Sequence, residues 1–68
     1  MDLDNIFKYH APDSDQQVAY EKLRSSAKSF AQAIVDLTPP CADQTAAIRK
    51  VREAVMTANA AIALKGQL

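Results

Sequence analysis

The sequence predicts an all-α protein: a short N-terminal helix or arm, followed by a long antiparallel two-helix hairpin that assembles as a compact homo-oligomer. Three observations predict this fold. Apolar residues recur at steps of three and four over two long stretches, which is the spacing of one helix face. Prolines at positions 12, 39 and 40 divide the chain into three segments. The chain has 68 residues, too few to bury a large core alone.

Residues 1–12 are expected to form the amino-terminal arm of a single domain that spans residues 1–68. Three large apolar residues in this arm have the spacing of one helical face, which predicts one or two helical turns or an ordered arm. They are Leu3, Ile6 and Phe7. Ala11-Pro12 ends the segment, because the residue before a proline avoids the α region.

Residues 14–37 are expected to form the first long helix. Ser14 is a suitable N-cap, and Gln17 three residues later would complete a capping box. The prolines at positions 39 and 40 end the helix. Its apolar face forms a coiled-coil-like seam, because the steps between its members alternate between three and four. The seam residues are Tyr20, Leu23, Ala27, Phe30, Ile34 and Leu37.

Residues 42–64 are expected to form the second long helix. Asp43 lies in its first turn and Gly66 follows its end, as helix start and stop signals favour. A short Pro-Pro link between two long helices predicts an antiparallel hairpin. The seam of this helix consists of Ile48, Val51, Val55, Ala58 and Ile62. Small residues on one flank of the seam would let another helix approach closely: Ala54, Ala58 and Ala61.

Self-association is the expected way for so short a chain to gain stability, because small domains otherwise depend on disulfides or a metal. The single cysteine, Cys41, cannot form an internal disulfide, and Cys41 with His10 supplies only two of the four ligands of a closed zinc site. Each seam covers the other on one side only, which favours a larger symmetric assembly, although a simple hairpin dimer also fits. The apolar side chains that still need cover are Ile6, Phe7, Val18, Val35, Met56 and Leu64.

Composition argues against several functional classes. Eight Lys and Arg residues balance eight Asp and Glu residues, so duplex nucleic acid is not an expected partner. No apolar run approaches the roughly 18 residues of a membrane span, and the acidic start does not resemble a signal peptide. A lone thiol fits a reducing, intracellular setting. The chain has one histidine and only two glutamates, each among bases, so we expect no enzyme, no metal and no cofactor.

Two basic rows are candidate anion sites. Arg24 and Lys28 lie one helical turn apart among three serines, which suits a phosphate or another anion. The alternative is a solvated face paired with the nearby glutamate. Arg49, Arg52 and Asn59 recur at helical spacing beside the second seam, where symmetry copies could bring them together around a multiply charged ligand. The alternative for this row is an ordinary polar flank.

The residues before the first proline are a third candidate. Tyr9-His10 precedes the turn at Ala11-Pro12, and an aromatic ring beside such a turn is a platform on which a base can stack. Packing of the arm onto the hairpin is the alternative. Cys41, at the start of the second helix, is expected to act only as a cap.

Four stretches of the chain resemble a known family. They are Phe7-Lys8-Tyr9-His10-Ala11-Pro12, then Tyr20-Glu21-Lys22-Leu23-Arg24 with Ala27-Lys28, then Ala46-Ala47-Ile48-Arg49, and last Arg52-Glu53-Ala54-Val55-Met56-Thr57-Ala58-Asn59-Ala60-Ala61-Ile62-Ala63. In these residues the sequence resembles the phage-encoded anti-CBASS proteins that act as cyclic-nucleotide sponges, whose helical hairpin also occurs in anti-Thoeris sponges. The resemblance covers nearly the whole chain.

The resemblance implies an inhibitor of bacterial anti-phage signalling that sequesters cyclic di- and trinucleotides, such as cyclic GMP-AMP and cyclic tri-AMP, without cleaving them. It implies a compact homo-hexamer in the host bacterial cytoplasm, with dinucleotide pockets at subunit pairs near the arm and trinucleotide pockets where three subunits meet. The residues implied for the dinucleotide site are Tyr9, His10, Arg24 and Lys28. The residues implied for the trinucleotide site are Arg49, Arg52 and Asn59. The alternative is a structural helical-hairpin module for oligomerisation, with no nucleotide ligand.

Overall fold

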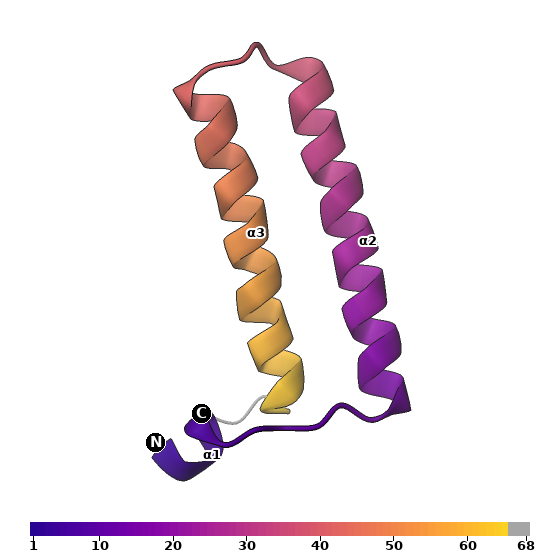
Figure 1. Cartoon of the computed structure of the whole chain (residues 1–68), viewed down its shortest axis with the longest axis vertical. Helices are drawn as coiled ribbons and strands as arrows, with labels where there is room; N and C mark the ends of the chain where they lie inside the picture. Colours follow the sequence, from indigo (N-terminus) through magenta and orange to yellow (C-terminus); the bar gives the residue numbers. More distant parts are fainter. Residues whose placement is uncertain (66–68) are drawn as a thin grey trace.

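The computed structural model describes residues 1–65, which form three α-helices and no strand (Figure 1). The helices are α1 (Leu3–Phe7), α2 (Ser14–Leu37) and α3 (Ala42–Ala63). The predicted all-α fold is therefore confirmed for this part of the chain. α2 and α3 lie side by side (Figure 1). The segment that joins α1 to α2 passes below the end of α3, so α1 and α2 lie on opposite sides of that end. None of the described helices is long and apolar enough to cross a membrane.

α2 begins with a capping box that lies one residue earlier than the sequence predicts. Asp13 is the N-cap, and its Oδ1 accepts a hydrogen bond from the backbone N–H of Gln16 at 2.8 Å. In return, the backbone N–H of Asp13 donates to Oε1 of Gln16 at 3.0 Å. The prediction of Ser14 and Gln17 in these roles is wrong, because Ser14 is already helical and the carboxylate of Asp13 before it accepts from a free amide of the first turn.

Two glutamines tie α2 to α3 near the ends of the hairpin. Nε2 of Gln16 donates to the carbonyl oxygen of Ile62 at 3.0 Å, so the start of α2 is held beside the end of α3. At the opposite end, Nε2 of Gln44 donates to the carbonyl and hydroxyl oxygens of Thr38, both at 3.1 Å. The carbonyl oxygen of Ile62 also accepts a hydrogen bond from the backbone N–H of Lys65 at 3.2 Å, so Gln16 uses its second acceptor position. The two glutamines thus join the helices at both ends of the hairpin.

The ends of α3 differ from the predicted signals. Cys41 occupies the N-cap position, but its side chain makes no capping hydrogen bond. The helix ends at Ala63 with Leu64 as its C-cap, and Lys65 then adopts a positive φ of 53°. The predicted stop signal, Gly66, lies outside the described residues. A left-handed conformation costs a non-glycine residue about 1 kcal/mol, so Lys65 is a residue type that disfavours the backbone conformation it adopts.

The seam between α2 and α3 is only half-buried. None of residues 1–65 is buried within one chain, so this part of the molecule has no closed core. Two predicted seam residues are exposed, Phe30 by 61% and Leu37 by 82%. Leu37 is the last residue of α2 and lies next to the link, whereas Phe30 lines a groove along the side of the hairpin. The seam prediction is therefore wrong at Leu37, whereas Phe30 lies on the predicted face, beside the seam residues Leu23 and Val55, and is only partly covered.

The chain has an elongated shape. Its principal extents are 43 × 25 × 15 Å and its radius of gyration is 14.7 Å, whereas a compact chain of this length has about 11 Å. Its accessible surface of 5543 Å² exceeds that of a compact 7.4 kDa monomer by about 1,300 Å². One copy therefore exposes surface that a compact monomer would cover.

Candidate functional site

The amino-terminal arm, residues 1–12, presents Tyr9 to solvent. α1 is a single short helix, and a side chain holds each of its ends. At its start, the backbone N–H of Asn5 donates to Oδ1 of Asp2 at 3.1 Å. Toward its end, Nε2 of His10 lies 2.6 Å from the carbonyl oxygen of Asn5. The ring of Tyr9, between Asn5 and His10 in the chain, is 83% exposed.

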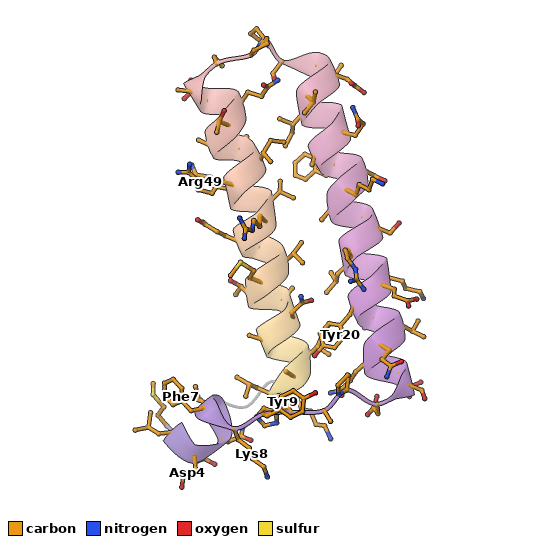
Figure 2. All side chains as sticks on the ribbon, viewed as in Figure 1. Asp4, Phe7, Lys8, Tyr9, Tyr20 and Arg49 are labelled. Carbon is orange, nitrogen blue, oxygen red and sulfur yellow. The ribbon has the colours of Figure 1, made fainter. Side chains whose placement is uncertain are left out.

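A hollow of about 280 Å³ lies between the arm and the end of α3. Tyr9 and His10 line it, together with two lysines that sequence reasoning missed, Lys8 and Lys65. Lys8 and Tyr9 follow each other on the arm below the end of α3 (Figure 2). No local pattern joins Lys8 to Lys65, because only the path of the arm brings them together. The remaining lining residues are Ala11, Asp13, Gln16 and Ala63.

A second, shallower hollow lies on α2. Arg24 and Lys28 line it with Glu21 and Ser25, and its volume is about 310 Å³. The structure therefore brings the two predicted cations together. Ser26, predicted to surround them, lines the groove on the other side of the helix instead.

A third hollow of about 330 Å³ lies on α3, where Arg49 and Arg52 meet Gln44, Thr45 and Ile48. Arg49 projects away from α2 (Figure 2). Two of the three residues predicted for a trinucleotide site are thus neighbours. Two arginines beside a hydroxyl and an amide can donate several hydrogen bonds to phosphate oxygens.

Asn59, the third residue of that prediction, does not line this hollow. Its side-chain oxygen is buried and has no hydrogen-bond partner among the described residues. A buried acceptor without a donor costs about 1–3 kcal/mol. Within one chain, Asn59 therefore has an unpaired side-chain oxygen and lies outside the hollow of the two arginines.

An apolar groove of about 440 Å³, larger than the three hollows above, lies between α2 and α3. Side chains two positions apart in a helix point in directions about 200° apart around the helix axis. Arg24 and Arg52 therefore lie roughly opposite Ser26 and Ala54, which line the groove, so both basic rows lie on the other side of the hairpin. The groove is lined by Leu23, Ser26, Ala27, Phe30, Lys50, Val51, Ala54, Val55 and Ala58.

The candidate residues do not form one site within a single chain. Tyr9 lies at the open end of the hairpin, where Gln16 meets α3. Arg24 lies eight residues further along α2, which is a distance of about 12 Å along the axis. A ligand that touches both Tyr9 and Arg24 must span this distance or contact two copies of the chain.

The described residues offer no cluster of three or more His, Cys, Asp or Glu side chains that could hold a metal ion. The donors present are instead cationic groups, hydroxyls and amides at open hollows. Such groups bind anions, and an exposed aromatic ring beside them adds a stacking surface.

Comparison with known proteins gives one match. The model of the hairpin domain of Acb2/Tad1 matches residues 1–63. No curated protein and no solved structure matches the chain.

Proposed function

This chain belongs to the Acb2/Tad1 hairpin family of anti-CBASS and anti-Thoeris sponges, and from that premise we propose that it binds and sequesters cyclic di- and trinucleotide messengers. The family supports a sponge-type role in phage anti-defence. The observation that carries the ligand class is Tyr9, a ring 83% exposed on a tied arm beside two lysines. Base stacking on such a ring contributes about 1–3 kcal/mol.

For a cyclic dinucleotide such as cyclic GMP-AMP, we propose that Tyr9 stacks on a base while Arg24 and Lys28 bind phosphates. The two cations share one hollow on α2. Because they lie about 12 Å along the axis from the arm, they belong in this proposal to a neighbouring copy. The site then exists only between subunits.

For a cyclic trinucleotide such as cyclic tri-AMP, we propose a site made by Arg49 and Arg52 of several copies. The two arginines share a hollow that faces away from the apolar groove. Asn59 joins this site in our proposal through its amide, whose oxygen lacks a donor within one chain. Convergence of copies concentrates positive charge that a single chain of zero net charge does not have.

We propose that antiparallel hairpins assemble as a compact homo-hexamer. The surface excess of about 1,300 Å² is larger than the roughly 800 Å² that one partner buries in a standard interface. Each copy therefore has surface for more than one neighbour, and the apolar groove supports one of these contacts. This assembly would act in the host bacterial cytoplasm, where the messengers are made.

We propose binding without turnover. The chain has one histidine, and its two glutamates, Glu21 and Glu53, lie on exposed helix positions. Cleavage of a phosphodiester needs a positioned acid–base pair, an activated nucleophile or a metal. The three basic hollows supply mainly cations and amides. The acid–base groups among their lining residues are Glu21, Asp13 and His10, of which Asp13 caps α2 and His10 is bonded to the backbone of Asn5.

The test is retention and intact release. The protein is incubated with cyclic GMP-AMP or cyclic tri-AMP, separated from free ligand, and digested with protease, and the released nucleotide is identified by mass spectrometry. The expected result is retention and release of the unchanged cyclic form. Recovery of a linear product, or no retention of either ligand, would falsify the proposal.

Variants of Tyr9 test whether its exposed ring stacks on a base of the ligand. Tyr9→Ala should weaken cyclic GMP-AMP binding about 5- to 150-fold, which corresponds to loss of one stacked base. Tyr9→Phe keeps the ring and should bind like the wild type. Tyr20→Phe, a change in the half-buried seam, serves as a control for altered tyrosine content.

The apolar groove favours a second candidate, a structural hairpin that binds another helix and no nucleotide. This candidate predicts assembly that does not depend on Tyr9 and no retention of cyclic nucleotides. The retention experiment therefore distinguishes the two functions.

A further inference from the structure

We propose that His10 is a positioning residue: its ring ties the end of α1 and so holds Tyr9 where it stacks on a base of a cyclic dinucleotide. The inference rests on the proposed function, in which Tyr9 is the stacking residue. It also removes His10 from the set of direct ligand contacts that the family resemblance implies.

The geometry of the His10 ring carries the inference. Nε2 lies 2.6 Å from the carbonyl oxygen of Asn5, and the contact is partly buried. Because a carbonyl oxygen can only accept, Nε2 carries the proton and donates. A ring nitrogen that already donates to the backbone is not free to donate to a phosphate.

The tie matters because little else orders the arm. α1 has five residues, far fewer than the roughly 12 that an isolated helix needs for even marginal stability. Its last carbonyl groups have no partner within the helix, and a histidine near a helix end can satisfy one of them. Asp2 holds the first turn only, and no residue of the arm is buried.

The bond from His10 to Asn5 also closes a short loop that contains Lys8 and Tyr9. A loop closed at both ends has fewer conformations than an open arm. The free energy that binding would otherwise spend on ordering Tyr9 is therefore spent during folding. Tyr9 can then be exposed and still be fixed in direction.

Two substitutions separate positioning from contact. Glutamine places its amide nitrogen near the position of Nε2 and can keep the bond to Asn5. Asparagine is shorter, places its amide nitrogen near the position of Nδ1, and cannot reach the carbonyl. His10→Gln and His10→Asn are thus a matched pair of neutral amides that differ only in whether the tie is kept.

The experiment combines affinity with a measure of order. Binding of cyclic GMP-AMP is measured by calorimetry for the wild type, His10→Gln, His10→Asn and Tyr9→Ala. The order of residues 3–9 in the free proteins is measured by ¹⁵N heteronuclear NOE. We expect His10→Gln to match the wild type within about threefold and His10→Asn to bind about tenfold more weakly, with lower NOE values in the arm of His10→Asn alone.

Three outcomes would overturn the inference. One is that His10→Asn keeps an ordered arm. Another is that it loses arm order and still binds like the wild type. The third is that His10→Gln keeps an ordered arm but binds as weakly as His10→Asn, which would make the ring a ligand contact.

If the wild type does not bind, or Tyr9→Ala binds equally well, the proposed function fails, and the ligand role of His10 fails with it. The NOE values then still decide separately whether the tie orders the arm.

Discussion

At the open end of the hairpin, hydrogen bonds of single side chains fix backbone segments that no buried core packs against among the described residues. Lys65 follows α3 in a left-handed conformation, Gln16 joins α2 to α3, and His10 is bonded to the end of α1. At the same scale, Asn59 has a buried oxygen without a donor. Each of these features has an energetic consequence that one substitution measures.

Lys65→Gly should stabilise the protein. Glycine adopts a positive φ without the steric cost that a Cβ imposes, so we expect a gain of about 0.5–1 kcal/mol in the free energy of unfolding. Lys65→Ala is the control, because it removes the same charge and keeps the Cβ. Urea unfolding at a fixed protein concentration measures both variants, and equal stabilities would contradict the left-handed conformation as the source of strain.

Asn59→Leu should also stabilise the protein, by about 1 kcal/mol, because it replaces a side chain whose buried oxygen lacks a donor with an apolar side chain of similar size. Ser29→Leu, at an exposed interior position of α2, controls for the general gain in helix propensity, because serine and asparagine both rank below leucine. Thermal unfolding followed by circular dichroism compares the two. A loss of stability in Asn59→Leu would mean that the amide finds a donor in the assembled protein.

At the scale of elements, the two long helices depend on caps and ties at their ends. Gln16 belongs to both kinds of interaction, because it completes the capping box of α2 and donates to the end of α3. The neighbouring Gln17 is exposed and takes no part in the capping box.

Gln16→Ala should lower the free energy of unfolding by about 1–2 kcal/mol, since it removes a cap interaction and an interhelical hydrogen bond. Gln17→Ala, one residue further on, should change it by less than about 0.5 kcal/mol. Chemical denaturation of both variants measures the difference. The opposite ranking would restore the capping box that the sequence predicts.

The periodic spacing of apolar residues was sufficient to predict the long helices, because tertiary context seldom overrides so long a repeat. It was not sufficient to place every side chain. Two overlapping capping boxes, from Asp13 and from Ser14, fit the sequence, and only the backbone decides between them. The period also does not show where the partner helix stops, so Leu37, the last residue of α2, was predicted in the seam and is exposed.

The candidate site was predictable in part for the same reason. Arg24 with Lys28, and Arg49 with Arg52, are close in the sequence, so helical spacing brings each pair together. Lys8 and Lys65 were missed because their shared hollow depends on the arm crossing the open end of the hairpin. No local pattern encodes that crossing.

At the scale of the whole molecule, the two faces of one hairpin differ in polarity. The apolar groove lies on one side and both basic rows lie on the other. Copies that pack through their grooves would leave the two basic rows, Arg24 with Lys28 and Arg49 with Arg52, facing outward toward other copies and ligands. In this arrangement, assembly completes both the core and the binding sites.

Phe30→Glu should therefore break the proposed assembly into smaller species, because it places a charge in the apolar groove that a neighbouring copy would cover. Phe30→Leu, which keeps an apolar side chain at the same position of the groove, is the matched control and should assemble like the wild type. Sedimentation velocity measures the sizes. Equal behaviour of the two variants would mean that the groove is not an interface.

Native mass spectrometry with cyclic GMP-AMP and cyclic tri-AMP tests the central claim, that assembly of hairpins builds sites that hold intact cyclic nucleotides. The account predicts one homo-hexameric mass that gains whole ligands of both kinds, at the same time and without displacement of one by the other. A monomer that binds these ligands, or an assembly that binds neither, would contradict it.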